Sequence, residues 1–306
     1  MKERVIEKTL LQQQKDVSNA QLQMKSKLQS ALKIDEISNA YNAYSKASFD
    51  DMLSGVENSN NTQKAYLSYQ NALKNHGFCE NDFVYIPHCP ICGDSGNDNG
   101  KVCKCVWDKY ISNLKDECEI DRRAKFSFDD CNFDVIRDTS QRQSLEKVYS
   151  LMHTYVKRYP DNKKNTIVLS GEVGTGKTCL ASAMCRALVE KGYATKILSA
   201  YEFGALMLET HVSPIAERNS KLHDVLSADV LLIDDLGTEP MLKNVTIEYL
   251  LLVLEERQNS NKTTFVTTNL NADGIHDRYG ERIYSRLSHK QISIIFDLQG
   301  QDLRTH

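Results

Sequence analysis

The feature that most constrains the fold is a glycine-rich segment in the second half of the 306-residue chain. Residues 171–178 read GEVGTGKT and match G-x-x-x-x-G-K-[ST] in full. A strand-like run, Thr166–Ser170, precedes this segment, and a helical stretch, Cys179–Lys191, follows it. Because glycines let the backbone curl until its N–H groups face one point, the pattern predicts a phosphate-binding loop between a strand and a helix.

The residues of this loop are candidate contacts to ATP and Mg²⁺. We expect Lys177 to reach the β- and γ-phosphates and the hydroxyl of Thr178 to bind Mg²⁺. The start of the following helix adds the positive end of its dipole. The expected nucleotide contacts in the loop are Gly171, Gly174, Thr175, Gly176, Lys177 and Thr178.

Further polar residues follow two later strand-like runs. The run Val230–Ile233 ends in Asp234 and Asp235, at the edge where open α/β sheets bind ligands. We expect Asp234 to hold Mg²⁺, directly or through water, and Asp235 to orient or deprotonate the attacking water. Asn269, which closes the next run, would polarise that water. These residues predict hydrolysis of ATP to ADP and phosphate, and we expect slow, switch-like turnover because Asp235 is one methylene shorter than Glu.

Two arginine-containing segments complete the set of candidate catalytic residues. Residues 281–287 read ERIYSRL, and on a helix Arg286 could stabilise the transferring phosphoryl group of a neighbouring subunit. Arg282 lies four residues earlier on the same helical face and could share that role. The alternative is that both arginines form ordinary surface ion pairs. Arg304 could reach the nucleotide phosphates from the end of the fold.

From about residue 122 onward, apolar strand-like runs alternate with amphipathic helical stretches. The runs are Thr166–Leu169, Lys196–Leu198, Val230–Ile233, Thr264–Thr267 and Ile292–Phe296. This alternation predicts a five-stranded parallel sheet with right-handed crossovers, and therefore an α/β P-loop NTPase core over residues 122–306.

Residues 1–60 predict a helical N-terminal region. Apolar residues recur there with a heptad-like step, interrupted at Gln13 and Lys27, which indicates one long amphipathic helix or two. The expected seam consists of Ile6, Leu10, Val17, Ala20, Met24, Ala31 and Ile34. It either packs against a second helix of the same chain, near Ala40–Leu53, or docks on another protein.

Residues 61–121 predict a zinc-binding module. A C-x-x-C pair is followed ten residues later by C-x-C, and the turn-rich GDSGNDNGKV between them can fold back as a hairpin. The expected ligands are Cys89, Cys92, Cys103 and Cys105. Four thiolates at this spacing suit a structural Zn²⁺ site, with an Fe–S centre or a redox C-x-x-C pair as alternatives. His88 and Cys79 are spare ligand candidates, and the other cysteines are expected to be ordinary thiols.

Composition narrows the class of protein further. The longest strongly apolar run, Tyr249–Leu254, is far shorter than the roughly 20 residues of a membrane-spanning helix. The N-terminus has no apolar signal region, and nine cysteines make a disulfide framework unexpected, so we expect a cytoplasmic protein with no membrane partner. With a net charge of −3, any binding of nucleic acid requires a local patch.

Taken together, the motifs resemble the AAA+ ATPases of the bacterial helicase-loader family, of the DnaC and DnaI type, with the IstB transposition helpers as close relatives. The matching segments are GEVGTGKT, VLLIDDLGTE, TTNL, ERIYSRL and GQDLR, within residues 122–306. The resemblance implies that Asp234 and Asp235 are the Walker B pair, Asn269 the first sensor, Arg286 the arginine finger and Arg304 the second sensor. It also implies a truncated lid, because few residues follow the last strand, and it places Phe126–Phe133 near the adenine.

The function that the resemblance implies is the ATP-dependent loading of a hexameric replicative DNA helicase onto single-stranded DNA. ATP would bridge neighbouring subunits, and binding and hydrolysis would control assembly and release. Tyr201, Phe203, Arg218 and Lys221 are candidate contacts to single-stranded DNA, with ordinary packing and solvation as the alternative. Two other functions remain open: a transposition helper that binds double-stranded DNA, and a P-loop switch that does not bind DNA.

Overall fold

The computed structural model describes residues 1–303, and the chain divides into two compact units. One unit comprises Met1–Glu7 together with Asp108–His306, and the other comprises Lys8–Trp107. No helix among residues 1–303 is long and apolar enough to cross a membrane.

The larger unit is built on a five-stranded parallel sheet with the strand order β4-β5-β6-β3-β7. The strands are β3 (Thr166–Gly171), β4 (Thr195–Ser199), β5 (Val230–Leu236), β6 (Thr263–Thr268) and β7 (Ser293–Leu298). All five predicted runs form strands of this sheet, so the predicted α/β P-loop core is confirmed. The strand that precedes the glycine-rich loop, β3, lies between β6 and β7.

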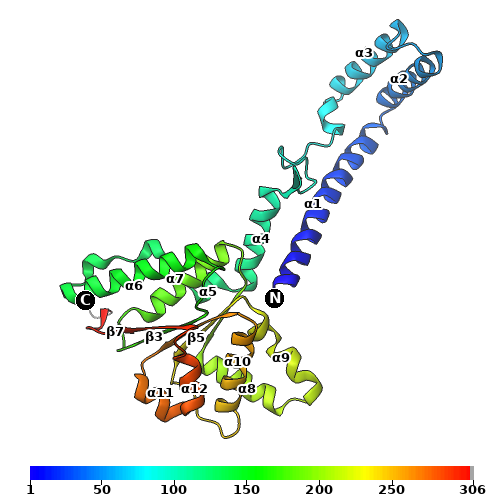
Figure 1. The fold of residues 1–306 in the computed structure, drawn as a ribbon. Coiled ribbons are helices and arrows are strands. Elements are labelled where there is room, and N and C mark those ends of the chain that lie inside the picture. Colours follow the sequence, from blue (N-terminus) through cyan, green and yellow to red (C-terminus); the bar gives the residue numbers. More distant parts are fainter. Residues whose placement is uncertain (304–306) are drawn as a thin grey trace. The chain divides into compact units, whose positions relative to one another are not determined.

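Helices cover both faces of this sheet (Figure 1). Successive strand residues point to opposite faces, so Ile167 and Leu169 belong to one hydrophobic core and Val168 to the other. The first core includes side chains from α4 (Lys104–Glu117), α5 (Ile120–Arg123), α6 (Thr139–Arg158) and α7 (Lys177–Glu190). The second includes α8 (Ala200–Val212), α9 (Ile215–Ser227), α10 (Thr246–Asn259), α11 (Ala272–Tyr279) and α12 (Glu281–Leu287). Two short 3₁₀ turns, η2 (Phe128–Asp130) and η3 (Phe133–Val135), precede α6.

The smaller unit is mostly helical. Its elements are most of α1 (Lys2–Ala31), then α2 (Asp35–Ser54), α3 (Asn60–Asn75), the 3₁₀ turn η1 (Glu80–Phe83) and the two-residue strands β1 (Asn97–Asp98) and β2 (Lys101–Val102). The strands pair antiparallel, which confirms the predicted hairpin between the two cysteine pairs. Helix α2 packs on α3 around the buried residues Ile37, Tyr69 and Leu73.

The predicted heptad seam of the first helix is wrong near its start. Ile6 and Leu10 are 43% and 53% exposed, whereas Val5 and Thr9 are buried. The buried residues Met1, Val5 and Thr9 are instead spaced by four residues. This is the i, i+4 spacing of one face of a straight helix, whereas a heptad seam requires the helix to supercoil. The main partner of α2 is α3 and not the first helix, which contributes Ala31 to their shared core.

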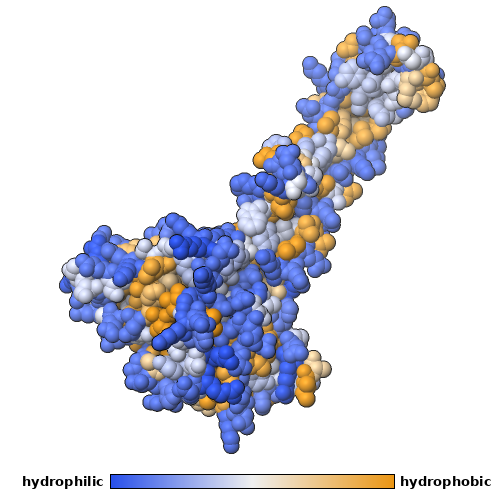
Figure 2. Space-filling view, in the orientation of Figure 1, coloured by the Kyte–Doolittle hydropathy of each residue, from blue (hydrophilic) through white to orange (hydrophobic). Residues whose placement is uncertain are grey.

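Helix α2 presents an apolar face that the described part of the chain does not cover. Phe49, Met52, Leu53 and Val56 follow the i, i+3, i+4, i+7 spacing of one helical face, with Val56 just beyond the end of the helix. Each is at least 50% exposed. Figure 2 shows apolar surface over the α2 and α3 end of this unit. Contiguous apolar surface of this kind commonly marks a protein interaction site.

Candidate functional site

The glycine-rich loop leaves β3 in a conformation that only glycine fits. Gly171 has φ +138°, and a Cβ atom there would lie 2.0 Å from the carbonyl oxygen of Leu298 in β7. Gly174 has φ +79°, and a Cβ atom there would lie 1.8 Å from Oδ1 of Asp302. Gly176, with φ +93°, immediately precedes α7. The loop is therefore confined by the end of β7 and by the segment that follows it.

Side chains of the loop donate hydrogen bonds to its own backbone carbonyls. The ammonium of Lys177 donates to the carbonyl oxygens of Gly171 (2.9 Å) and Glu172 (2.5 Å), and Lys177 is only 5% exposed. The hydroxyl of Thr175 donates to the same Glu172 carbonyl at 2.9 Å. A polyphosphate would offer this buried cation anionic oxygens, which bind an ammonium more strongly than neutral carbonyls do. The donor set of the loop therefore fits a nucleotide.

The two acids at the end of β5 lie beside the start of α7. Oδ1 of Asp234 accepts hydrogen bonds from the hydroxyls of Thr178 (3.0 Å) and Thr267 (2.6 Å). The backbone N–H of Asp235 donates to the same Thr267 hydroxyl at 2.8 Å. Thr178 and Asp234 thus place two oxygen ligands side by side, which fits a Mg²⁺ site that takes its remaining ligands from water and phosphate.

A backbone irregularity sets the direction of these acids. Asp235 has φ +58°, and the register between β5 and β6 shifts between Ile233 and Leu236. A bulge of this kind re-aims side chains and is common beside active sites. A non-glycine residue in the left-handed region also carries strain, which the surrounding hydrogen bonds must hold.

Burial is the main influence on the acidity of Asp234. It raises the pKa of the carboxyl, and the negative charge of Asp235 adds to the rise. The hydrogen bonds from Thr267 and Thr178 and the positive charge of Lys177 act in the opposite direction without cancelling it. A carboxylate in this environment gains from a divalent cation, because the cation offsets the cost of holding charge away from water.

A cavity of about 380 Å³ opens beside the loop and brings several predicted residues together. Its polar end contains Lys177, Thr178, Asp235 and Asn269. Its other lining residues are Phe126, Asp130, Cys131, Asn132, Phe133, Ile136, Leu145, Tyr149, Val173, Gly174, Gly176, Cys179 and Leu303. The cavity thus joins a polar end suited to phosphates to an apolar end suited to a base, and five residues of the segment Phe126–Phe133 are part of its wall.

The predicted arginine finger, Arg286, does not line this cavity. Arg286 in α12 donates to the carboxylate of Glu255 in α10 at 2.9 Å and is not among the lining residues. Arg304 lies outside the described residues.

Sequence reasoning missed Thr267 as a site residue. This side chain is fully buried and contacts both Asp234 and the backbone of Asp235. Thr267 stands in the same TTN segment, residues 267–269, that pointed to Asn269. The direction of its side chain could not be predicted, because it depends on the pairing of β5 with β6.

Three of the four candidate contacts to single-stranded DNA have structural partners. Phe203 is 3% exposed and belongs to a hydrophobic core. Arg218 donates to the carbonyls of His211 and Ser213 at the end of α8, and Lys221 pairs with Glu209. Only Tyr201 of this set is both exposed, at 67%, and without a core position. For Phe203 the structure therefore favours the alternative of ordinary packing.

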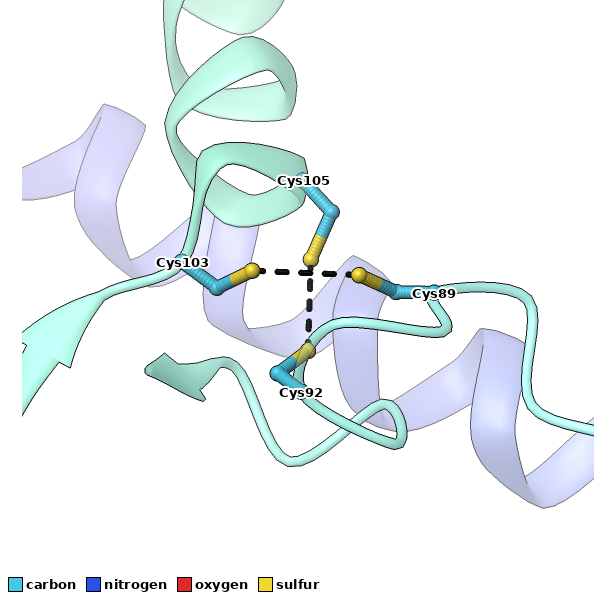
Figure 3. A group of neighbouring side chains, drawn as sticks. All are labelled: Cys89, Cys92, Cys103 and Cys105. Carbon is cyan, nitrogen blue, oxygen red and sulfur yellow. Dashed lines mark hydrogen bonds between the residues drawn. The ribbon is translucent and has the colours of Figure 1, made fainter. Parts of the chain in front are cut away.

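The smaller unit contains a cluster of four cysteine sulfurs (Figure 3). The Sγ atoms of Cys89 and Cys103 are 3.7 Å apart, and those of Cys92 and Cys105 are 3.6 Å apart. All four sulfurs lie within 4.8 Å of one another. A tetrahedral zinc site with Zn–S bonds of about 2.3 Å has S···S edges of roughly 3.8 Å, so the cluster fits Zn²⁺. These distances exclude disulfides, whose S–S bonds are about 2 Å.

Hydrogen bonds hold the loop that carries this cluster. The carboxylate of Asp94 accepts the backbone N–H groups of His88 and Cys89, both at 2.8 Å, and the hydroxyl of Tyr85. Burial opposes ionisation of Asp94, but these hydrogen bonds outweigh it and lower the pKa to about 2. Of the spare ligand candidates, Cys79 donates to Asp82, and the His88 ring faces Asp94. Neither is in the four-sulfur cluster.

The sheet order, the strand–loop–helix unit and the paired acids together define an α/β P-loop protein of the AAA+ type. The model of one family, described as IstB-like ATP binding protein, matches residues 119–297, more than half of the chain. The chain belongs to this family, which confirms the predicted resemblance.

Curated relatives are similar over part of the chain. The replicative helicase loader DnaC of Escherichia coli strain K12 is 28% identical over 159 residues, which cover 51% of this chain and 62% of that protein. The phage-like element PBSX protein XkdC of Bacillus subtilis strain 168 is 27% identical over 218 residues, covering 65% and 79%. The replicative helicase loader DnaI of the same organism is 30% identical over 149 residues, covering 48% and 46%. The match thus spans about three fifths of the length of the DnaC relative.

Proposed function

We propose that this chain is an ATP-dependent loader of a hexameric replicative DNA helicase onto single-stranded DNA. The names of the DnaC and DnaI relatives support the choice of function. The observation that carries the proposal is the convergence of Lys177, Thr178, Asp235 and Asn269 on one cavity, with Asp234 bonded to Thr178. This arrangement can bind a nucleotide triphosphate and activate a water molecule beside it.

We assign roles within the cavity as follows. Lys177 binds the β- and γ-phosphates, and Thr178 and Asp234 hold Mg²⁺, which neutralises phosphate charge when bound. Asp235 and Asn269 orient the attacking water. Because the carboxylate of Asp235 is held on a strained bulge and is one methylene shorter than Glu, turnover is slow and suits a switch.

Self-association completes the site in this proposal. Among the described residues that line the cavity there is no arginine, and Arg286 lies elsewhere, on α12. We propose that Arg286 leaves Glu255 and stabilises the phosphoryl group bound by the neighbouring subunit. Binding of ATP between neighbouring subunits then stabilises their assembly, and hydrolysis of that ATP releases the subunits from one another. Arg304 would act as the second sensor.

The region N-terminal to the ATPase domain would bind the helicase. We propose a helical region over residues 1–60, a zinc-binding module over residues 61–121 and an AAA+ ATPase domain over residues 122–306. The Cys₄ site would be structural, because four thiolates leave no open position on Zn²⁺. The exposed apolar face of α2, formed by Phe49, Met52, Leu53 and Val56, supports a docking role for the helical region.

Co-purification tests the loader proposal directly. The full chain is mixed with the replicative helicase of its own organism, with and without MgATP, and the complex is measured by size-exclusion chromatography with light scattering. We expect a complex whose stoichiometry or lifetime depends on ATP. Absence of any complex under both conditions would contradict the proposal.

Three variants test the roles in the cavity. Lys177→Ala should lose nucleotide binding, whereas Arg286→Ala should bind nucleotide normally and lose turnover. Arg158→Ala, at an exposed position of α6, is the matched control and should retain both. If Arg286→Ala hydrolysed ATP at the wild-type rate, the role in trans would be wrong.

A second candidate function is supported by the family description itself. An IstB-like ATP binding protein could instead be a transposition helper that binds double-stranded DNA. Binding of labelled single strands and duplexes distinguishes the two, because a helper should prefer duplex DNA and should not bind the helicase.

A further inference from the structure

The last described residues lie against the phosphate-binding loop. The backbone N–H of Leu303 donates to the carbonyl oxygen of Gly174 at 3.1 Å, and the Leu303 side chain lines the cavity. The side chain of Asp302 is so close to Gly174 that a Cβ atom there would lie 1.8 Å from its Oδ1. We call residues 300–303 the tail strap. It forms one wall of the cavity and restricts the central glycine of the loop.

A single side chain from α6 fastens this strap. Nε2 of Gln141 donates to the carbonyl oxygen of Gln301 at 3.0 Å, and its Oε1 accepts the N–H of Gln301 at 3.1 Å. The side-chain amide thus pairs with one backbone residue as a neighbouring strand would. Gln141 is only 7% exposed, so water competes little for these two bonds.

The strap approaches Gln141 as closely as a glycine allows. Gly300 has φ +140°, and a Cβ atom there would lie 2.1 Å from Cδ of Gln141 and 2.3 Å from its Nε2. Gln141 cannot move aside for a larger residue without breaking both of its bonds to Gln301. The contact between the strap and α6 therefore depends on a matched pair, Gln141 and Gly300.

The same helix also supports the phosphate-binding loop. Leu145 lies one turn after Gln141, lines the cavity, and would be 3.7 Å from a Cβ atom on Gly176. Helix α6 thus contacts the loop through Leu145 and the strap through Gln141, and the strap contacts the loop again through Leu303. Helix α6, the loop and the strap therefore each contact the other two along one side of the cavity.

We propose that Gln141 is a positioning residue that fastens the tail strap against the phosphate-binding loop, and that the fastened strap is the form of the cavity that binds nucleotide. This inference rests on the proposed binding of ATP in this cavity. Gln141, which lies outside all the recognised motifs, would thus control the affinity of the cavity for nucleotide.

The expected effect follows from the population of the fastened form. When only part of the molecules is competent to bind, the apparent affinity falls in proportion to that part. Loss of two buried, neutral hydrogen bonds corresponds to roughly a tenfold change in an equilibrium constant. Gln141→Ala should therefore weaken nucleotide binding by up to about tenfold.

The first experiment compares Gln141→Ala with Gln143→Ala in the full chain. Gln143 lies on the same helix, is exposed, and serves as the matched control. Binding of a fluorescent ATP analogue is titrated with Mg²⁺ present, and hydrogen exchange is measured at the amides of Gln301 and Leu303 without nucleotide. We expect Gln141→Ala alone to bind more weakly and to exchange faster at both amides. Wild-type affinity and wild-type exchange in Gln141→Ala would overturn the proposal.

The second experiment tests the matched pair. Gly300→Ala should weaken binding because the added Cβ displaces Gln141. In the double variant Gln141→Ala/Gly300→Ala this collision is absent, although the backbone strain of Ala at φ +140° remains. Its affinity should therefore be higher than the product of the two single effects predicts. Effects that multiply independently would overturn the proposed contact.

The outcome for the wild-type chain separates this inference from the proposed function. If the wild type does not bind ATP, the proposed function is wrong, and the claim about affinity fails with it. The exchange measurement still decides whether Gln141 fastens the strap, because it needs no nucleotide. If the wild type binds ATP and Gln141→Ala binds it equally well, only the inference about Gln141 is wrong.

Discussion

Replacement of Thr267 by Val tests whether this buried hydroxyl holds both acids of the site. Val keeps the shape of the side chain and removes Oγ1, which accepts from the N–H of Asp235 at 2.8 Å and donates to Asp234 at 2.6 Å. Thr267 is fully buried, so water cannot easily replace either bond.

We expect Thr267→Val to lower both the thermal stability of the protein and its affinity for Mg²⁺. A buried donor left without a partner costs about 1–3 kcal/mol, which for a unit of this size lowers the thermal midpoint by roughly 2–4 °C per kcal/mol. Loss of a hydrogen bond that orients a metal-binding carboxylate typically costs about 10–100-fold in metal affinity or activity. The Mg²⁺ concentration that gives half-maximal ATP hydrolysis should therefore rise by at least about tenfold in Thr267→Val.

Calorimetry and a Mg²⁺ titration of ATP hydrolysis measure these two effects. Thr154→Val, at an exposed position of α6, is the matched control and should change neither. A Thr267→Val variant with a wild-type Mg²⁺ response would refute the claim that this hydroxyl orients Asp234, even if the protein were less stable.

Three further predictions concern stability and metal content. Arg257→Met should lower the free energy of unfolding by several kcal/mol in urea titrations, because the carbonyls of Val225, Ala228 and Thr263 would lose the buried guanidinium that donates to them. Hydrogen bonding to Arg123 is the main reason that the pKa of Glu202 is lowered to about 2 from 4.5. The stabilisation of the fold by ionised Glu202 is therefore present above about pH 4.5 and lost as the pH falls toward 2. The free energy of unfolding of Glu202→Gln should fall less than that of the wild type over that interval. Parallel plots of unfolding free energy against pH for the two proteins would contradict this. Purified wild type should contain one equivalent of zinc and Cys92→Ser much less, as measured by mass spectrometry; a folded wild type with little zinc would refute the site.

Local sequence patterns were sufficient for much of the larger unit. Strand β5 was predictable because buried parallel strands read as continuous apolar runs, and Val230–Ile233 is such a run. The glycine-rich loop was predictable because its shape depends on a few adjacent residues. The resemblance to a known family followed from these segments, and family membership is confirmed over residues 119–297.

The first helix shows where such patterns fail. Its apolar residues fit a heptad seam, yet Ile6 and Leu10 are exposed while Val5 and Thr9 are buried. The face that a helix buries depends on the elements packed against it, and Ile6 and Val5 point in directions only about 100° apart. Periodicity alone could not distinguish these two faces. The proposed roles of the site residues and the division into three regions stay predictions.

The order of residues along the chain was enough to predict the phosphate-binding loop, the strand-end acids and the paired cysteines, because each is made by neighbours in sequence. The pairing of β3 with β7 was not readable in this way, and it is what brings Leu298 against Gly171 and carries the tail strap to the loop. Gln141 and Gln301 are 160 positions apart, and nothing local to either one indicates the other. Contacts between distant segments depend on how the sheet and helices pack, because burial of apolar surface selects the arrangement of the whole chain at once.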